Sequence, residues 1–270
     1  AAIAKTDARA LIPLLADVSP RVRLQAAIAL GKLAEPAAVD ALFVMADQAA
    51  AEPVLRHAVV TGLAGCAHPG QLAARKSDPS LAVRLASVVA LRRQASPAIQ
   101  EFLGDADPLV VEEAALAIHD DRSIPGALPR LAALVDATPC SEVILRRAIN
   151  ANLRLGTPES AARLLAFGLN EAAPRPMRQE ALTALRVWPE PPPLDRVDGV
   201  ARRFTPVRID GVLAPKLDQL LALADPGLKT LAIEILLAHS LQAGAGQIAA
   251  IVGDAKASGP LRAQSLRLMA

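Results

Sequence analysis

The chain has 270 residues, of which 53% are hydrophobic and only 2% aromatic, and its 29 basic and 27 acidic residues give a formal net charge of +2. This balance excludes the strong positive field expected of a nucleic-acid-binding surface, so we expect no nucleic-acid partner. The sequence contains no run of about 18 apolar residues that could span a bilayer, and no charged segment followed by an apolar core that would resemble a signal peptide. We therefore expect no membrane insertion.

A segment recurs eight times along the chain: a helix-breaking entry, a basic residue, and then an Ala-rich apolar run. Successive copies are 33, 28, 27, 35, 32, 51 and 33 residues apart. The equivalent positions are Arg23, Arg56, Arg84, Val111, Arg146, Arg178, Lys229 and Arg262. A period in this range is typical of stacked two-helix units, and it predicts an all-α solenoid of the HEAT or armadillo kind with about eight helix pairs.

Each copy begins where a second helix of a pair should begin. In several of them Asp, Ser or Glu stands before Pro, which is typical of an N-cap followed by Pro at the first helical position. The first helices are predicted between these copies. Their ranges are 7–17, 36–48, 69–76, 97–104, 124–136, 158–170, 212–224 and 246–256.

One step of the period is much longer than the others and contains a Pro-rich stretch that begins at Trp188. Prolines at this density cannot continue a helix, so we predict a non-helical insertion over residues 189–210 in an otherwise continuous domain of residues 1–270. Trp188 at its entrance either fills the hole left by an irregular repeat or introduces a docking loop. The chain ends inside an apolar helix without a polar closing helix, and from this we expect it to be part of a longer protein.

Several residues are predicted to have structural roles. The recurring arginines, here Arg23, Arg56 and Arg84, should donate hydrogen bonds to an Asp or a carbonyl group within or between repeats. Asn150 and Asn152 occupy positions where other repeats have apolar residues or Gly, so at least one of them should be buried and bonded to a neighbouring loop carbonyl or to a second domain.

Four basic or titratable residues stand eight positions after the anchor of four successive repeats: Arg92, His119, Arg154 and Arg186. They could be cations that favour a helix C-terminus, or a ridge that binds a partner. With the insertion they form our candidate partner-binding surface. The insertion residues in this set are Asp195, Arg196, Arg202 and Arg203.

No catalytic, cofactor or metal site is predicted. The four histidines lie in different repeats without a second His at helical spacing, and Cys66 and Cys140 lack a CxxC or CxxCH pattern. Two buried reduced thiols are expected. No phosphate loop, nucleophile elbow or catalytic triad is recognisable.

The segments LRHAVVTGLAG (55–65), VRLASVVALRR (83–93), FLGDADPLVVEEAALAIHD (102–120), LRRAINANLRLG (145–156) and DRVDG (195–199) resemble the HEAT-repeat region of large bacterial membrane-bound dehydrogenase-like proteins, frequent in planctomycetes. Members of that family join a β-propeller, HEAT repeats and a c-type cytochrome. The resemblance implies a scaffold that works in the periplasm or otherwise outside the cytoplasm, with the propeller or cytochrome c domain as partner.

We therefore predict a non-enzymatic protein-interaction module that positions catalytic and electron-transfer domains. Two alternatives remain open. One is an enzyme built on HEAT repeats, such as a bilin lyase-like protein or an alkylpurine DNA glycosylase, although a single Trp and no Tyr fit the glycosylase poorly. The other is a stand-alone cytoplasmic HEAT scaffold.

Overall fold

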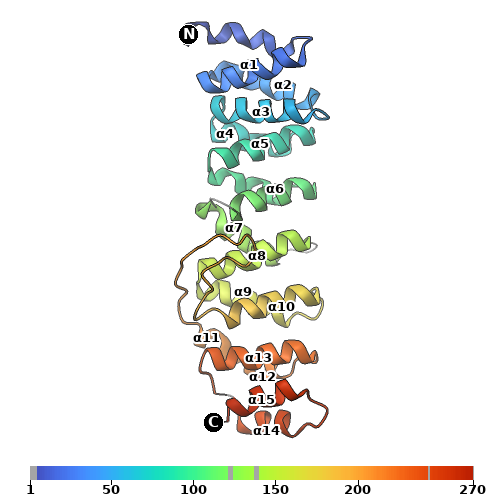
Figure 1. Cartoon of the computed structure of the whole chain (residues 1–270), viewed down its shortest axis with the longest axis vertical. Coiled ribbons are helices and arrows are strands. Elements are labelled where there is room, and N and C mark those ends of the chain that lie inside the picture. The colour runs from blue at the N-terminus through green and yellow to red at the C-terminus, as the bar shows by residue number, and fades with distance from the viewer. Residues whose placement is uncertain (1–4, 121–123, 137–139, 243, 270) are drawn as a thin grey trace. The chain divides into compact units, whose positions relative to one another are not determined.

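The computed structural model describes residues 5–120, 124–136, 140–242 and 244–269. Within these residues all regular elements are helices, and the one pairing of strand type is an isolated antiparallel bridge between Leu194 and Ala201. The chain divides into two compact units, Ala1–Ala127 and Leu128–Ala270. In each unit, helix pairs stack in chain order (Figure 1). The predicted all-α solenoid of helix pairs is confirmed, whereas its treatment as a single domain stays a prediction.

In the first unit, short first helices alternate with longer second helices. The first helices, where η marks a 3-10 helix, are η1 (Lys5–Ala16), η2 (Pro36–Ala38) with α2 (Val39–Gln48), α4 (Pro69–Ala73) with η3 (Ala74–Ser77), and η4 (Pro97–Gly104). The second helices are α1 (Pro20–Leu33), α3 (Pro53–Cys66), α5 (Leu81–Arg93) and α6 (Pro108–His119), and η5 (Pro125–Ala127) follows them.

The second unit continues the alternation. Its first helices are α7 (Leu128–Ala132) with η6 (Ala133–Asp136), α9 (Pro158–Leu169), α11 (Asp210–Leu213) with η7 (Ala214–Lys216) and α12 (Leu217–Leu221), and α14 (Ala245–Gly253). Its second helices are α8 (Glu142–Leu155), α10 (Arg175–Arg186), α13 (Pro226–Ala238) and α15 (Gly259–Arg267). These bounds agree with the predicted ranges to within a few residues.

Side-chain capping marks the start of several second helices, but not of α1 and α3, whose N-cap residues Ser19 and Glu52 make no side-chain cap hydrogen bond. The side chains of Asp107 and Asp225 accept hydrogen bonds from the first-turn amides of α6 and α13, and Pro follows each of them. Helix α5 differs from the prediction, because its cap is Ser80 and not Asp78. The Asp78 carboxylate instead accepts a hydrogen bond from the Ser80 amide at 3.0 Å and so orders the residues just before the helix.

Many first helices are wholly or partly 3-10 in geometry. Pro13 lies inside η1, and Pro215 inside η7. Because Pro lacks an amide hydrogen and crowds the preceding turn, it prevents a regular α-helix there. In η4 the apolar residues Ile99, Phe102 and Leu103 are buried, so the apolar stripe still faces the core.

The closest helix contact in the first unit joins α1 and α3 through glycine. A Cβ atom built on Gly65 would lie 2.0 Å from the carbonyl oxygen of Gly31. A Cβ built on Gly31 would meet the Thr61 carbonyl oxygen at 2.6 Å. Since no side chain fits between these backbones, the two helices touch directly.

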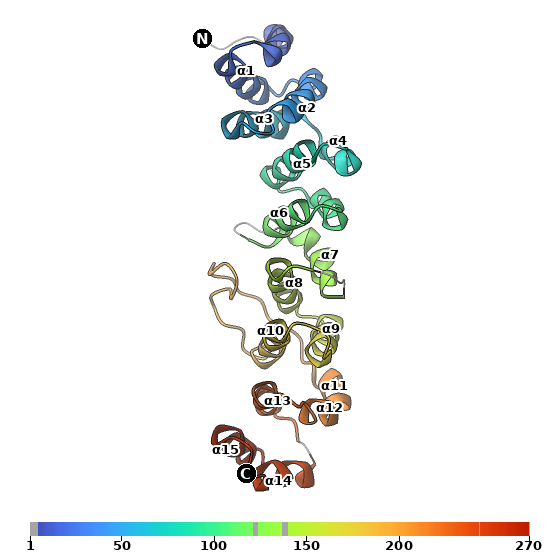
Figure 2. The same ribbon diagram turned by 90° about the vertical axis from the view of Figure 1, so that its right-hand side faces the viewer.

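The insertion separates α10 from α11. Residues 187–209, all of which are described, contain no helix, as the proline content predicted. This segment runs beside α8 and α10 (Figure 2). It brings the DRVDG motif against the second helices of this unit.

Candidate interaction surfaces

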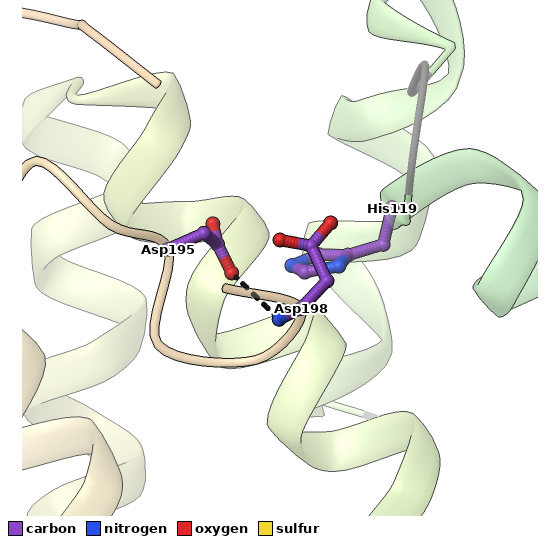
Figure 3. Close-up of side chains that lie close together, drawn as sticks. All are labelled: His119, Asp195 and Asp198. Carbon is purple, nitrogen blue, oxygen red and sulfur yellow. Dashed lines mark hydrogen bonds between the residues drawn. The ribbon is translucent and has the colours of Figure 1, made fainter. Parts of the chain in front are cut away.

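The DRVDG motif forms a tight turn organised by Asp195. The Asp195 amide donates to the Val200 carbonyl at 3.0 Å, and the Gly199 amide donates to the Asp195 carbonyl at 3.0 Å. The Asp195 carboxylate accepts from the amides of Val197 at 2.9 Å and Asp198 at 3.3 Å, the second of which is drawn in Figure 3. Gly199 has a φ of +70°, which favours glycine. The motif is therefore an Asp-initiated turn with a defined shape.

A group of four charged side chains anchors this turn to α8. Arg154 donates to Oδ2 of Asp195 from Nε at 2.9 Å, and its Nη2 lies 2.7 Å from the same oxygen. Arg202 donates to both carboxylate oxygens of Asp198, at 2.6 and 2.7 Å. The side chain of Arg154 is only 5% exposed and that of Asp195 only 1%. Two of the insertion's carboxylates are thus neutralised by arginines in the interior of the unit.

Burial and charge act in opposite directions on these groups. Burial raises the pKa of Asp198, but hydrogen bonds from Arg202 and from the Val200 amide outweigh it and hold the pKa at about 2. Burial lowers the pKa of Arg154 from its usual value, and Asp195 opposes this effect. Asp198 is therefore ionised at neutral pH, and the hydrogen bonds that it accepts from Arg202 are charge-assisted.

Two further contacts hold the insertion against the unit. Arg196 donates to both carboxylate oxygens of Glu180 on α10, at 2.9 and 3.0 Å. The buried Trp188 donates from Nε1 to the Val207 carbonyl at 2.8 Å, and the Val207 amide donates to the Gly156 carbonyl at 3.0 Å. Trp188 therefore both fills the core and ties down the far end of the insertion.

The anchored insertion leaves apolar side chains in solvent. Leu194 is 58% exposed and Val207 is 51% exposed. Val200 and Arg203 are also exposed. Since surrounding contacts fix the backbone, these side chains are presented in defined positions.

The predicted partner-binding ridge needs correction. His119 is buried at the end of α6 with Nδ1 2.8 Å from the Asp120 carboxylate, and Arg154 is buried beside Asp195. Arg92 lies 3.3 Å from Glu113, and Arg186 lies 3.5 Å from Glu234. Each of the four thus has an acidic neighbour, and two of them are not accessible to a partner.

The insertion residues predicted to bind a partner also differ in how far they are accessible. Asp195 and Arg202 are turned inward into the charged group, and Arg196 is bound to Glu180. Arg196 and Arg203 are the exposed members of this set, but Arg196 is already bonded to Glu180. Sequence reasoning missed the Arg154–Asp195 pair. The Asp-Gly pair at residues 198–199, a common turn signal, is the feature that could have pointed to an ordered turn there.

The arginines predicted to have structural roles make the expected bonds. Arg23, Arg56 and Arg84 each donate to a carbonyl group six residues earlier, at 3.1, 2.8 and 2.8 Å. Arg84 also binds the carboxylate of Asp105 in the following repeat, at 2.9 and 3.3 Å. Arg23 lies 3.5 Å from Glu52, also of the following repeat.

Asn150 and Asn152 are both buried. Asn152 donates to the carbonyl of Ala132 at 2.9 Å and of Ala148 at 2.8 Å, and it accepts from Arg163 at 3.2 Å. The prediction was a loop carbonyl, whereas both carbonyls that accept from Asn152 belong to helices, and Ala132 is the last residue of α7. This amide links the two helices of its pair.

Of the two cysteines, Cys66 is buried as expected, and burial raises the pKa of its thiol to about 11. Cys140 is only half-buried, which differs from the prediction. Burial raises its pKa as well. Both thiols are therefore protonated at neutral pH and weakly nucleophilic.

An open groove of about 580 Å³ lies between α3 and α5 in the first unit. Half-buried or buried apolar side chains of both helices form its walls, and Arg56, His57 and Arg93 stand at its edges. Arg93 donates from Nη1 to the Thr61 hydroxyl at 2.7 Å and from Nη2 to Nδ1 of His57 at 3.4 Å. No sequence pattern pointed to this groove, because it depends on the distance between two helices.

Residues 9–36 match the family model described as HEAT repeat. This segment covers most of η1 and all of α1, one helix pair of the first unit. Comparison with curated protein sequences gives no match. None of the helices in the described ranges combines the length and the apolar character needed to cross a membrane.

Among solved structures, the chain is similar to an engineered protein from the Northeast Structural Genomics Consortium, with 17% identity, a TM-score of 0.45, and coverage of 97% of this chain and 77% of that one. A second engineered protein from the same consortium has 15% identity and a TM-score of 0.28, over 86% of this chain and 98% of that one. A designed armadillo repeat protein has 14% identity and a TM-score of 0.26, over 85% and 98%.

The helix pairs of this structure and the matched repeat define a HEAT-like helical-repeat protein. Such folds present extended surfaces and are typical of scaffolds that bind other proteins. The chain is in this sense a helical-repeat protein with an insertion between α10 and α11.

Proposed function

We propose that this chain is a non-enzymatic protein-interaction module whose insertion carries the surface on which a neighbouring domain docks. One observation supports the proposal above all. The insertion is held by the buried Arg154–Asp195 pair and by Trp188, yet it leaves Leu194 and Val207 exposed. Ordering an irregular segment costs conformational entropy, and exposed apolar side chains held on an ordered segment favour an interaction site.

In this proposal the docking domain belongs to the same parent protein. The resemblance of the repeats to those of bacterial dehydrogenase-like proteins favours a β-propeller or a cytochrome c domain, and a site of action outside the cytoplasm. The module would hold these two domains at a distance suited to electron transfer. The chemistry would remain in the domains, and the chain itself would need neither metal nor haem.

The reading frame is the first test. A propeller sequence on one side of this chain and a CxxCH motif on the other would support the proposed parent protein, and a frame with neither would overturn that part of the proposal. The flanking domains would then be expressed separately, and their affinity for the chain measured by isothermal titration calorimetry.

The second test changes the exposed apolar side chains. Leu194→Asp with Val207→Asp should weaken binding of the docking domain by about tenfold or more, which corresponds to about 1.4 kcal/mol. Leu109→Asp is the matched control, since Leu109 is 57% exposed and lies on α6. An equal loss in the control, or no loss in the double variant, would remove the insertion from the interface.

The non-enzymatic part has its own test. The purified chain should contain no stoichiometric zinc or haem by elemental analysis and absorption spectroscopy. It should also turn over no sugar with an artificial electron acceptor. Turnover of a sugar, or stoichiometric zinc or haem in the purified chain, would contradict the non-enzymatic proposal.

A further inference from the structure

The groove between α3 and α5 has space for a side chain that this chain does not supply. Its volume of about 580 Å³ is within the range of about 300–1,000 Å³ that is usual for ligand pockets. The reason for the space is local: Ala82 and Ala86, four residues apart on one face of α5, are small where Leu or Ile would fill the gap. Val60 of α3 and Leu85 and Val89 of α5 form apolar walls around it.

The groove is lined by residues of successive repeats. Ala46 of α2 and Glu113 of α6 belong to the lining together with residues of α3 and α5. Beyond the groove, Gln94 ties the C-terminal ends of α3 and α5 together by donating to the carbonyls of Ala64 and Ala67 at 3.0 and 2.8 Å. A lining drawn from four helices suits a segment of chain better than a compact small molecule.

The charge at the edges of the groove is positive and not neutralised. Arg56 donates to the Ala50 carbonyl, and Arg93 donates to Thr61 and His57. Across the part of the chain that the structure describes, neither arginine has a carboxylate within ion-pair distance. This differs from Arg84, which is bonded to Asp105.

The remaining charged groups at the groove do not change this balance. Since the Arg93 guanidinium can only donate, Nδ1 of His57 is the acceptor in this contact. Glu113 lies 3.3 Å from Arg92, and this arginine balances the negative charge of Glu113. An apolar groove therefore lies between two guanidinium groups that can each still pair with an anion.

We propose that this groove binds an acidic segment of a partner protein, which places a large apolar side chain between α3 and α5 and carboxylates against Arg56 and Arg93. Arginine favours bidentate pairing with carboxylates, and a buried apolar anchor surrounded by such pairs is the usual anatomy of a peptide site. Arg93 is already held in place by Thr61, so little side-chain freedom is lost on binding. The site is in the first unit and is independent of the insertion.

An acidic partner protein fits these observations better than a nucleic acid. The phosphate backbone is bound by broad basic surfaces, whereas only two unpaired arginines border an apolar wall here. A fatty acid would use the apolar wall and one arginine, and the experiment separates that outcome.

The experiment uses the full chain and a fluorescent peptide in which Leu recurs at helical spacing and every polar position is Glu. A second peptide keeps the Leu positions and replaces each Glu by Lys. Fluorescence anisotropy should show binding of the Glu peptide and at least tenfold weaker binding of the Lys peptide, with the difference reduced at high salt. Equal binding of the two peptides, or displacement of the Glu peptide by lauric acid with no effect of peptide charge, would overturn the proposal.

Variants locate the site. Arg56→Glu with Arg93→Glu should weaken binding of the Glu peptide at least tenfold, whereas Arg21→Glu, an exposed arginine of α1 outside the groove lining, should leave it unchanged. Ala82→Trp should fill the groove and weaken binding without lowering the melting temperature. Unchanged affinity in both groove variants would place the peptide elsewhere. Since Leu194 and Val207 are untouched, domain docking at the insertion would be retained in these variants, so the two proposals fail separately.

Discussion

Arg154 and Asp195 are 41 residues apart in the chain, and their side chains form a hydrogen-bonded ion pair in the interior of the second unit. Arg154 belongs to a regular helix, and Asp195 to the turn of an irregular insertion. The pair therefore joins a helix to a segment that belongs to no helix. It explains how a Pro-rich segment of this length is held in one conformation.

Removal of one member of this pair should destabilise the second unit strongly. Asp195→Ala removes the carboxylate that bonds the buried Arg154 guanidinium, and removing one member of a buried ion pair typically costs about 3–5 kcal/mol. Equilibrium denaturation in urea, followed by circular dichroism, measures this loss. Glu142→Ala is the control, because Glu142 forms an exposed pair with Arg146 at 2.6 Å that should contribute only about 0.5 kcal/mol. Similar losses in the two variants would mean that the Arg154–Asp195 pair is not a buried anchor.

Asp198 should make stability depend on pH in the acid range. Its pKa is lowered from 3.8 to about 2, so the unfolded chain takes up the proton before the folded chain does. Its contribution, about 2 kcal/mol, is therefore fully present above about pH 4 and is lost as the pH falls towards about 2. Asp198→Asn should be less stable than the parent chain at about pH 6, and the difference between the two should shrink towards about pH 2. A constant difference across this range would contradict the assignment.

Trp188 should report on the insertion by fluorescence, because it is the only Trp in the chain. It is 1% exposed, so its native emission should be blue-shifted and poorly quenched by acrylamide. Asp195→Asn should increase acrylamide quenching if release of the turn loosens the segment that covers the indole. Trp188→Phe should cost about 1–3 kcal/mol beyond lost packing, since the Val207 carbonyl loses its donor. A native emission already typical of solvent-exposed indole would show that Trp188 does not close the core.

Glycine substitutions test the direct contact of α1 and α3. Gly65→Ala would place a methyl group against the Gly31 carbonyl, so α1 and α3 would have to separate and the melting temperature should fall by several degrees. Gly104→Ala is the matched control, because a Cβ there would meet nothing within 4 Å. This control should be neutral or stabilising by up to about 1 kcal/mol through the unfolded state. If the two variants melt alike, the helices do not touch as described.

The positions of the helices could be predicted from the sequence because the signals for them are local. A cap such as Asp107 or Asp225 satisfies amides two or three residues away, and Pro after it prepares the first turn. The proline density after Trp188 likewise excludes a helix without any knowledge of the rest of the chain. The bonds of Arg23, Arg56 and Arg84 follow as well, because each acceptor lies six residues before its arginine.

The roles of the charged residues were decided by tertiary structure alone. Arg92 and Arg154 occupy equivalent repeat positions, yet the first is partly exposed beside Glu113 and the second is buried beside Asp195. The difference in burial between Arg92 and Arg154 arises because the turn of the insertion packs against α8. No local pattern in α8 predicts that turn. The groove between α3 and α5 likewise depends on tertiary structure. Its residues are ordinary helix residues, and only the spacing of two helices that meet in three dimensions leaves a space between them.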